Sequence, residues 1–154
     1  MMTKSVKPIP DGYHQVTAYL VVKGAAEALT FYQKAFGAIE RMRFTTPAGT
    51  IGHAEIMIGE SCVMLADEYP EMNCIGPKTL GGTSVSLMVY VEDVDHFVER
   101  AVNAGAKVLR PVQDMFYGDR TGTLEDPFGH QWHIATHIED LTQEELEERA
   151  KSHM

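Results

Sequence analysis

The stretch 16–37, VTAYLVVKGAAEALTFYQKAFG, contains two hydrophobic patterns in succession. Its first part, together with Gln15, is rich in β-branched and aromatic residues and ends at Lys23-Gly24, which is typical of a strand. Apolar residues then recur at three- and four-residue steps, as on one face of a helix, until Gly37. The stretch therefore predicts a strand followed by an amphipathic helix.

The same pattern returns about seventy residues later. The stretch 85–105, VSLMVYVEDVDHFVERAVNAG, again predicts a strand and then a helix that ends at a glycine. Setting Val22 against Val91 keeps the two predicted helix ends in register to within one residue. A solenoid needs at least about three repeats to bury its faces, so two copies predict a paired arrangement around one shared centre.

Three more strands are predicted after the first helix, at 39–45, 50–58 and 61–66. After the second helix, extended structure resumes at AKVLRPVQ and closes with a strand that begins at His130. The predicted fold class is α+β, with paired βαβββ modules that form a cup-shaped, mostly antiparallel sheet with helices outside.

The sequence predicts a single domain over 13–141, with modules at about 13–67 and 83–138. Between the modules, the stretch 67–83 has two prolines, three glycines and no periodicity, which is typical of a long linker or lid. A capping-box pattern, T-x-x-E, opens a short predicted helix in the C-terminal tail, 142–154.

Composition and charge limit the classes of partner. Asp and Glu number 22 against 13 Lys and Arg, and the basic residues form no stripe that could follow a phosphate backbone. No stretch approaches the roughly 18 apolar residues of a membrane span, and no signal-peptide pattern opens the chain. Cys62 and Cys74 lack disulfide-framework or metal-knuckle spacing. We therefore expect a cytoplasmic protein that binds neither nucleic acid nor membrane.

Alternation along the predicted strands separates a helix-covering face from a mixed face. The helix-covering set is Val16, Ala18, Leu20, Val22, Ala54, Ile56, Ile58, Val85, Leu87, Val89, Val91, Trp132 and Ile134. The mixed set includes Thr17, Tyr19, His53, Glu55, Ser86, Met88, Tyr90, His133 and His137. Tyr19 and Tyr90 are interpreted as matching positions in the two copies. Two mixed faces that curve toward each other would line a pocket with a few polar groups, as small-molecule sites do.

The stretch 126–137, DPFGHQWHIATH, combines a turn with the last predicted strand. Its D-P-x-G start is typical of a type I turn. Trp132 is predicted to face the helices, and His133 and His137 the mixed side. Just upstream, Arg120 is expected to pair with Asp119 or Asp126 and fix the loop.

The paired copies resemble the glyoxalase, bleomycin-resistance and dioxygenase superfamily, also called vicinal oxygen chelate proteins. The resemblance covers about 13–141 and rests on VTAYLVVKGAAEALTFYQKAFG, GHAEIMIGES, YGDRTGTLEDPFGHQW and ATHIEDL. The combination of YGDR with DPFGH is most similar to the PhnB-like branch. This resemblance implies a homodimer with a cup that binds a small organic molecule. The cup could form within one chain or by exchange between two chains.

Metal-dependent members of the superfamily place His, Glu or Gln on the first and last strands of each copy. Carried over by the resemblance, these positions fall on Thr17, Met64, Ser86 and His133. His133 alone is a strong ligand, because a neutral hydroxyl binds Zn or Ni poorly and a thioether suits Cu(I). We therefore expect no metal or other cofactor at these positions.

A displaced metal site is the alternative. His53 and Glu55 share one strand face, and together with His133 they could bind Zn, Ni, Mn or Fe. Glu55 could instead act as a general base, with a pKa raised by burial and with His133 as its proton partner. A third interpretation is a hydrogen-bonded carboxylate that orients His53.

Three functions stay open, because one fold hosts unrelated activities. The first is binding of a small organic molecule without a metal, and its candidate ligand-binding residues are Thr17, Tyr19, His53, Met64, Ser86, Tyr90 and His137. The second is a metal-dependent lyase, isomerase or dioxygenase with the displaced site. The third is a drug-sequestering resistance protein without catalysis. If the protein is an enzyme, it is a lyase, isomerase or oxidoreductase, and the candidate catalytic residues are Glu55 and His133.

Overall fold

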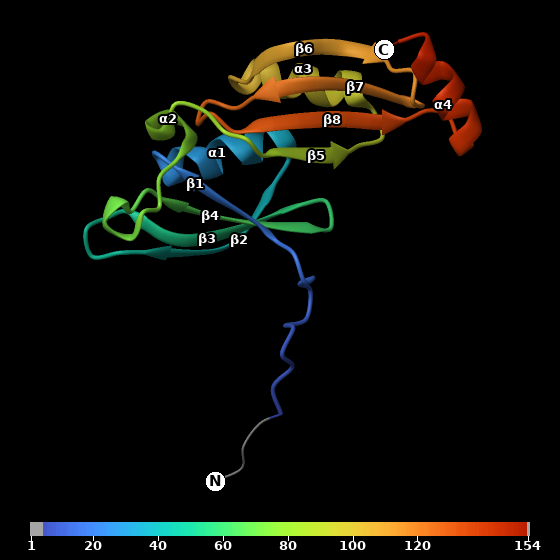
Figure 1. Ribbon diagram of the computed structural model, residues 1–154. Helices are drawn as coiled ribbons and strands as arrows, with labels where there is room; N and C mark the ends of the chain where they lie inside the picture. Colours follow the sequence, from blue (N-terminus) through green and yellow to red (C-terminus); the bar gives the residue numbers. More distant parts are fainter. Residues whose placement is uncertain (1–4, 154) are drawn as a thin grey trace.

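The computed structural model describes residues 5–153 and contains two βαβββ modules (Figure 1). The first module consists of β1 (Ala18–Val22), α1 (Ala25–Phe36), β2 (Ile39–Thr45), β3 (Ile51–Ile58) and β4 (Ser61–Asp67). The second consists of β5 (Ser86–Tyr90), α3 (Val94–Ala104), β6 (Lys107–Asp114), β7 (Asp119–Glu125) and β8 (Gln131–His137). The segment between them contains the short helices η1 (Pro70–Met72) and α2 (Pro77–Leu80), which the sequence did not predict, and the chain continues after β8 into α4 (Gln143–Lys151).

Each module has its own four-stranded sheet, in the orders β1-β4-β3-β2 and β5-β8-β7-β6. The first and last strands of each module are parallel neighbours, and the other neighbours are antiparallel. The predicted α+β fold with mostly antiparallel βαβββ modules is confirmed. The strands are divided between two sheets, and the strands that open the modules, β1 and β5, are both edge strands.

Local sequence signals set the limits of the helices. Helix α1 ends at Gly37, whose left-handed backbone (φ 66°) lets its N–H return to the carbonyl of Gln33. The Asp93 carboxylate caps the start of α3 by accepting the N–H of His96. The predicted capping box is present at the start of α4, where Thr142 and Glu145 cap each other's backbone.

A single hydrophobic core joins the helix-covering faces of both sheets. Helix α1 packs on the first sheet and against α3, and its aromatic side chains also reach the second sheet. The rings of Tyr32 and Phe36 lie 5.6 Å and 4.8 Å from that of Trp132, measured between centroids. Trp132 is only 1% exposed, which confirms that it faces the helices. Apolar burial around α1 therefore contributes to holding the two modules together.

The carboxylate of Asp126, 2% exposed, lies inside this core and accepts four hydrogen bonds. One oxygen accepts the backbone N–H groups of Phe128 and His130 at 2.9 and 3.0 Å, which fixes the predicted turn. The other accepts the Tyr32 hydroxyl at 2.5 Å and the Trp132 indole N–H at 2.9 Å. Burial and the carboxylate charge raise the pKa of Tyr32 well above its ordinary value, so its hydroxyl stays a donor. Asp126 thus links α1 of one module to β8 of the other.

Two details of the predicted faces are wrong. Val16 and Val85 are 88% and 68% exposed, because both precede the strands that they were expected to belong to.

The predicted pairing of Arg120 is also wrong, since its guanidinium binds Asp95 and Asp114. Strand alternation explains the difference: Arg120 and its neighbour on β7 point to opposite faces, and Arg120 reaches Asp95 on α3.

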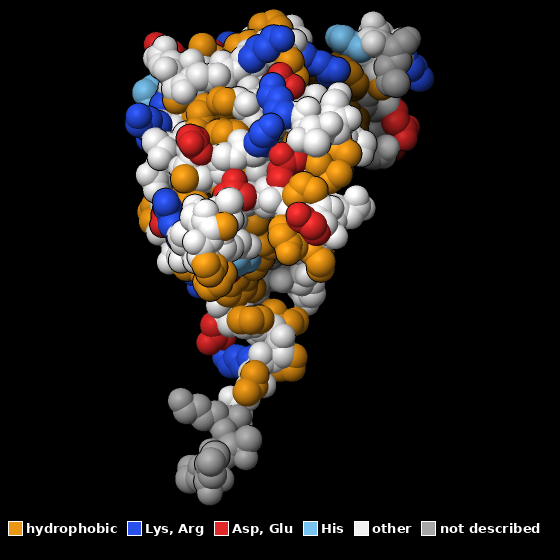
Figure 2. All heavy atoms as spheres, turned by 90° about the vertical axis from the view of Figure 1, so that its left-hand side faces the viewer, with side chains coloured by type: hydrophobic (Ala, Val, Ile, Leu, Met, Phe, Trp, Pro, Cys, Tyr) orange, Lys and Arg blue, Asp and Glu red, His pale blue; other side chains and the backbone are white. Residues whose placement is uncertain are grey.

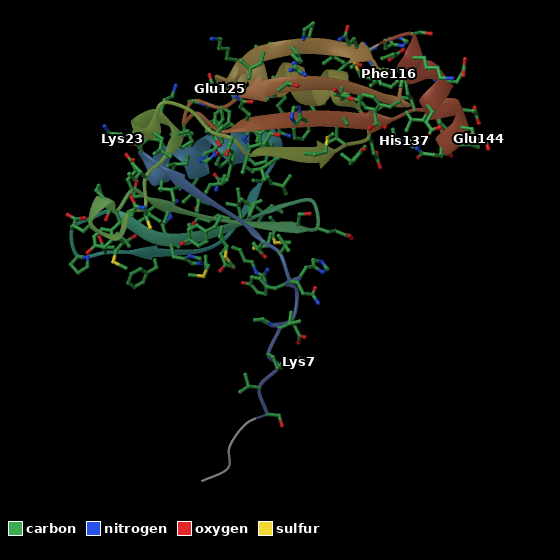
Figure 3. The ribbon with its side chains drawn as sticks, viewed as in Figure 1. Lys7, Lys23, Phe116, Glu125, His137 and Glu144 are labelled. Carbon is green, nitrogen blue, oxygen red and sulfur yellow. The ribbon has the colours of Figure 1, made fainter. Side chains whose placement is uncertain are left out.

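The part of the chain around Lys7 extends away from both sheets, as Figure 3 shows. On the side of the molecule shown in Figure 2, hydrophobic side chains reach the surface among charged ones. Within residues 5–153, no helix combines the length and the apolar character that crossing a membrane requires.

The opposite environments of Trp132 and His133 give a direct test of the face assignment. Trp132→Ala should lower the free energy of unfolding by about 3 to 5 kcal/mol, because it removes a large buried aromatic side chain. His133→Ala should fold nearly as the wild type does. Urea titrations of both variants measure the two losses, and a stable Trp132→Ala beside an unfolded His133→Ala would show that the faces were assigned in reverse.

Candidate small-molecule site

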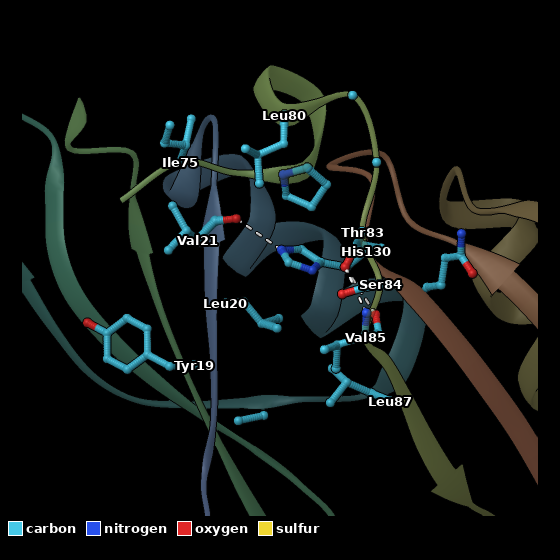
Figure 4. A pocket seen from close by; sticks show the side chains of 15 residues that line it. Tyr19, Leu20, Val21, Ile75, Leu80, Thr83, Ser84, Val85, Leu87 and His130 are labelled. Atoms are coloured by element: carbon cyan, nitrogen blue, oxygen red, sulfur yellow. Dashed lines mark hydrogen bonds between the residues drawn. The ribbon is translucent and has the colours of Figure 1, made fainter. Parts of the chain in front are cut away.

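A cavity of about 660 Å³ lies between the two modules, where the edge strands β1 and β5 face each other (Figure 4). Its walls are mainly apolar and come from β1, β5 and the segment that contains α2. The side chains of Thr83, Ser84, His130 and Gln131 add a few polar atoms. The cavity therefore combines an apolar wall with a small number of polar groups.

His130 connects the modules across this cavity. Its ring lies between β1 and β5 in Figure 4, and its Nε2 is 2.9 Å from the carbonyl oxygen of Val21 on β1. A carbonyl only accepts, so Nε2 carries the proton and Nδ1 is the acceptor in the neutral ring. The backbone N–H of His130 is meanwhile held by Asp126. The buried Asp126 carboxylate thus fixes the backbone from which this imidazole projects.

A second cavity, of about 520 Å³, also lies between the modules and shares Ala18 and Leu87 with the first. The predicted ligand-binding residues are divided among these places. Tyr19 borders the first cavity, Thr17 and Tyr90 border the second, and four residues border neither: His53, Met64, Ser86 and His137.

Several cavity residues were missed by the sequence analysis. His130 was interpreted only as the residue that follows the turn and begins the last strand, and Ile75 and Leu80 lie in the segment described as a linker or lid. The mixture of apolar residues with glycines and prolines in 67–83 is the signal that could have placed part of that segment over a cavity.

On the mixed face of the first sheet, four side chains form a continuous hydrogen-bonded chain. Glu55, 5% exposed, accepts the hydroxyl of Tyr13 and the Nε2–H of His53, the latter at 2.8 Å. The Nδ1 of His53 lies 2.7 Å from the hydroxyl of Tyr19. The guanidinium of Arg41 stacks 4.9 Å above the Tyr13 ring.

The protonation of Glu55 differs from the prediction. Burial raises the pKa of its carboxyl group, but hydrogen bonds from Tyr13 and His53 and the nearby charge of Arg41 outweigh burial and leave that pKa below the ordinary value. The predicted rise of the Glu55 pKa is therefore wrong. The observed contact matches the alternative interpretation, a hydrogen-bonded carboxylate that orients His53.

The mixed face of the second sheet carries two separate clusters. In the first, the two ring nitrogens of His133 each lie 2.9 Å from a hydroxyl, that of Thr123 or that of Ser86. His133 is not hydrogen-bonded to Glu55, its predicted proton partner.

In the second cluster, Asp119 accepts the Tyr90 hydroxyl at 2.7 Å and contacts His137 Nδ1 at 2.8 Å, while His137 Nε2 lies 2.7 Å from Asp140. The hydrogen bonds to Asp119 and then to Asp140 raise the pKa of His137. Tyr90 does not match Tyr19: with Val22 set against Val91, the position that corresponds to Tyr19 is Met88.

The donor atoms do not fit the metal sites considered from the sequence. Both nitrogens of His133 are hydrogen-bonded to hydroxyls, and its neighbours at the carried-over positions offer weak ligands. Within residues 5–153, no group of three or more His, Cys, Asp or Glu side chains is arranged to hold a metal ion. The displaced set of His53, Glu55 and His133 is thus not brought together.

The chain belongs to the glyoxalase/bleomycin resistance protein/dioxygenase superfamily, whose family model matches residues 12–134. It is 41% identical over 136 residues to the uncharacterized protein Mb0911c of Mycobacterium bovis, across 86% of this chain and 89% of that protein.

Solved structures agree with this membership. TioX from Micromonospora sp. ML1 is 30% identical, with a TM-score of 0.62 over 84% of this chain and 100% of that chain. A PhnB protein from Bacillus cereus shares the fold at 22% identity, with a TM-score of 0.62 over 80% of this chain and 99% of that one.

The lowered pKa of Glu55 predicts a specific loss of stability in acid. A carboxyl group whose pKa is lower in the folded state stabilises the fold above its ordinary value of 4.5, and this contribution is lost as the pH falls through the folded-state value. Glu55→Gln should therefore show a smaller loss of stability between about pH 5 and pH 3 than the wild type does. Denaturant titrations at several pH values measure it.

Glu60→Gln, in the exposed turn after β3, is the matched control and should keep the wild-type pH dependence. An unchanged pH dependence in Glu55→Gln would contradict the assignment of an ionised, hydrogen-bonded carboxylate.

Proposed function

We propose that this chain binds a small organic molecule in the cavity between its two modules, without a metal ion. The observation that carries the proposal is the cavity of about 660 Å³ between β1 and β5. This volume lies within the range of roughly 300–1,000 Å³ in which small molecules bind, and such sites are commonly apolar with a few polar groups.

The cavity wall favours an uncharged, largely apolar ligand. Aliphatic side chains such as Leu20, Ile75, Leu80 and Leu87 form most of the surface, and the lining residues include no Lys, Arg, Asp or Glu. The hydroxyl of Ser84 would orient one polar group of the ligand, while that of Thr83 is bound to the backbone of Val85.

The other functions are less well supported. Sequestration of a drug without catalysis would use the same cavity, and it agrees with the resistance proteins named in the family description. A metal-dependent lyase, isomerase or dioxygenase finds no support in the donor atoms of His133 and its neighbours.

The proposal includes a homodimer in the cytoplasm. Two large side chains of β2 on the mixed face of the first sheet, Met42 and Phe44, are 42% and 57% exposed. A second copy that covers them would bury apolar surface. The two cysteines, both free thiols, agree with a reducing compartment.

Filling the cavity should prevent ligand binding. Gly82 borders the cavity, has open space around its Cβ position and has no left-handed backbone, so Gly82→Phe places a ring there without strain. We expect this variant to bind 2-naphthol, a neutral aromatic probe, at least about tenfold more weakly than the wild type, a difference of 1.4 kcal/mol. Nuclear magnetic resonance titration measures the affinity and locates the probe.

Ala48→Phe adds the same ring at an exposed turn that does not border the cavity, and should bind the probe as the wild type does. Backbone shifts should appear in β1, at 80–87 and around His130. Shifts confined to other parts of the chain, or equal affinities in the two variants, would contradict the proposed site.

A further inference from the structure

We propose that Tyr19 is a proton-transfer residue toward the ligand, with His53 as its proton acceptor and Glu55 as the residue that positions His53. The transfer to a ligand rests on the proposed function, because it needs a molecule bound beside Tyr19. The activation of the Tyr19 hydroxyl depends only on the protein's own side chains and can be tested without a ligand.

The hydrogen bonds determine which atom is free to accept a proton. Glu55 is ionised at neutral pH, because its pKa is lowered, and a carboxylate only accepts. The 2.8 Å contact therefore places the proton of His53 on Nε2. In the neutral ring Nδ1 is then an acceptor, and it receives the Tyr19 hydroxyl at 2.7 Å. The order carboxylate, imidazole, hydroxyl is the arrangement by which an adjacent base activates a hydroxyl.

The hydrogen-bonded series of Glu55, His53 and Tyr19 leads from the interior of the protein to its surface. The side chain of Glu55 is 7% exposed and that of His53 is 28% exposed, while Tyr19 as a residue is 49% exposed. A buried carboxylate costs free energy unless it is hydrogen-bonded, and Tyr13 and His53 supply these bonds. The buried end is thereby fixed, and the reactive end is open to a ligand.

The second module has no equivalent of this chain. The pairing of β3 with β4 sets Glu55 beside Met64, and the pairing of β7 with β8 sets Thr123 beside His133. Thr123 therefore occupies the place of Glu55, and Met88 that of Tyr19.

The second module does contain a phenol, a carboxylate and an imidazole, but there Asp119 contacts both Tyr90 and His137, so the phenol is bound to the carboxylate and not to the imidazole. The order carboxylate, imidazole, phenol is therefore a feature of the first module that the internal repeat does not explain.

The proton balance of the step is complete. A ligand O–H or C–H proton moves to the oxygen of Tyr19 as the Tyr19 proton moves to Nδ1 of His53. The product is a ligand anion and an imidazolium, and the imidazolium is held by the Glu55 carboxylate through Nε2–H. Burial raises the pKa of Tyr19, which keeps the phenol neutral until the ligand arrives.

These groups favour a neutral ligand with a weakly acidic proton, such as a phenol or an enol. The ring of Tyr19 borders the apolar cavity, while its hydroxyl points away from the gap that holds His130 and Leu80, toward the mixed face (Figure 4). A ligand whose apolar part fills the cavity would therefore have to extend past the Tyr19 ring, out of the cavity and toward the mixed face, to place an acidic group beside this hydroxyl. The cavity lining has no Lys or Arg that would attract a ligand already ionised.

The test is the rate at which Tyr19 reacts with phenylmethylsulfonyl fluoride, followed by peptide mass spectrometry. The phenol oxygen forms an S–O bond, the S–F bond breaks, fluoride leaves, and the phenol proton passes to His53. Tyr90 is the internal control: it is 60% exposed, but its hydroxyl is bound to the carboxylate of Asp119, a weaker base than imidazole. We expect Tyr19 to react roughly 10²-fold faster than Tyr90, a typical effect of a general base.

His53→Gln and Glu55→Gln should both bring the rate at Tyr19 down toward that at Tyr90. His14→Gln changes an exposed histidine that is not part of the hydrogen-bonded series Glu55, His53 and Tyr19, and should leave the rate at Tyr19 unchanged. In the wild type, ¹⁵N spectra should show the Nε2–H form of His53, and Glu55→Gln should weaken that preference. If Glu55→Gln does not fold, His53→Gln still decides the matter, because this side chain is partly exposed.

Equal rates at Tyr19 and Tyr90, or fast reaction of Tyr19 in His53→Gln, would overturn the proposal. Its failure is separate from that of the proposed function. Binding of 2-naphthol in the cavity with an unreactive Tyr19 would leave the binding function without proton transfer. A reactive Tyr19 in a protein that does not bind 2-naphthol would support the activated hydroxyl and count against the proposed cavity ligand.

Discussion

The buried carboxylate of Asp126 is the interaction on which the arrangement of the modules depends. It accepts two backbone N–H groups of its own turn and two side-chain donors, Tyr32 of α1 and Trp132 of β8. A buried charge without such donors would cost several kcal/mol, and buried donors without it would each cost about 1–3 kcal/mol. The residues that surround Asp126 are therefore constrained to this one geometry.

The candidate site follows from that geometry. Because Asp126 fixes the backbone of His130, the imidazole can reach the carbonyl of Val21 on β1 and connect the two edge strands. The cavity lies between these strands, and α1 supports both modules behind it. The mixed faces of the two sheets take no part in this core, so the hydrogen-bonded polar side chains on one sheet can differ from those on the other. The series on the first sheet ends in the exposed hydroxyl of Tyr19, and the second sheet holds His133 between two hydroxyls.

Periodicity predicted most of the fold. The repeat of strand and helix, the alternation that buries Trp132, and the D-P-x-G turn all depend on residues close together in the sequence. Contacts between distant residues could not be predicted in this way. Tyr32 and Asp126 are 94 positions apart, and no local pattern indicates that they meet.

The same limit applies to the candidate site. Strand alternation placed His53 and Glu55 on one face, and their hydrogen bond follows from that spacing. The pKa of Glu55 was predicted in the wrong direction because Tyr13, 42 positions away, supplies a donor that offsets burial. The cavity was missed in part because His130 and the segment around α2 acquire their roles only when β1 and β5 come together.

The most direct measurement of the central claim, that Asp126 couples the two modules, is a double-mutant cycle with Tyr32→Phe and Asp126→Asn. Unfolding can be followed through Trp132, the single tryptophan of the chain. Because the Tyr32 hydroxyl donates directly to Asp126, we expect a coupling free energy of about 1 to 3 kcal/mol. Losses of stability that add to within about 0.5 kcal/mol would show that the two residues act independently, and would contradict this account.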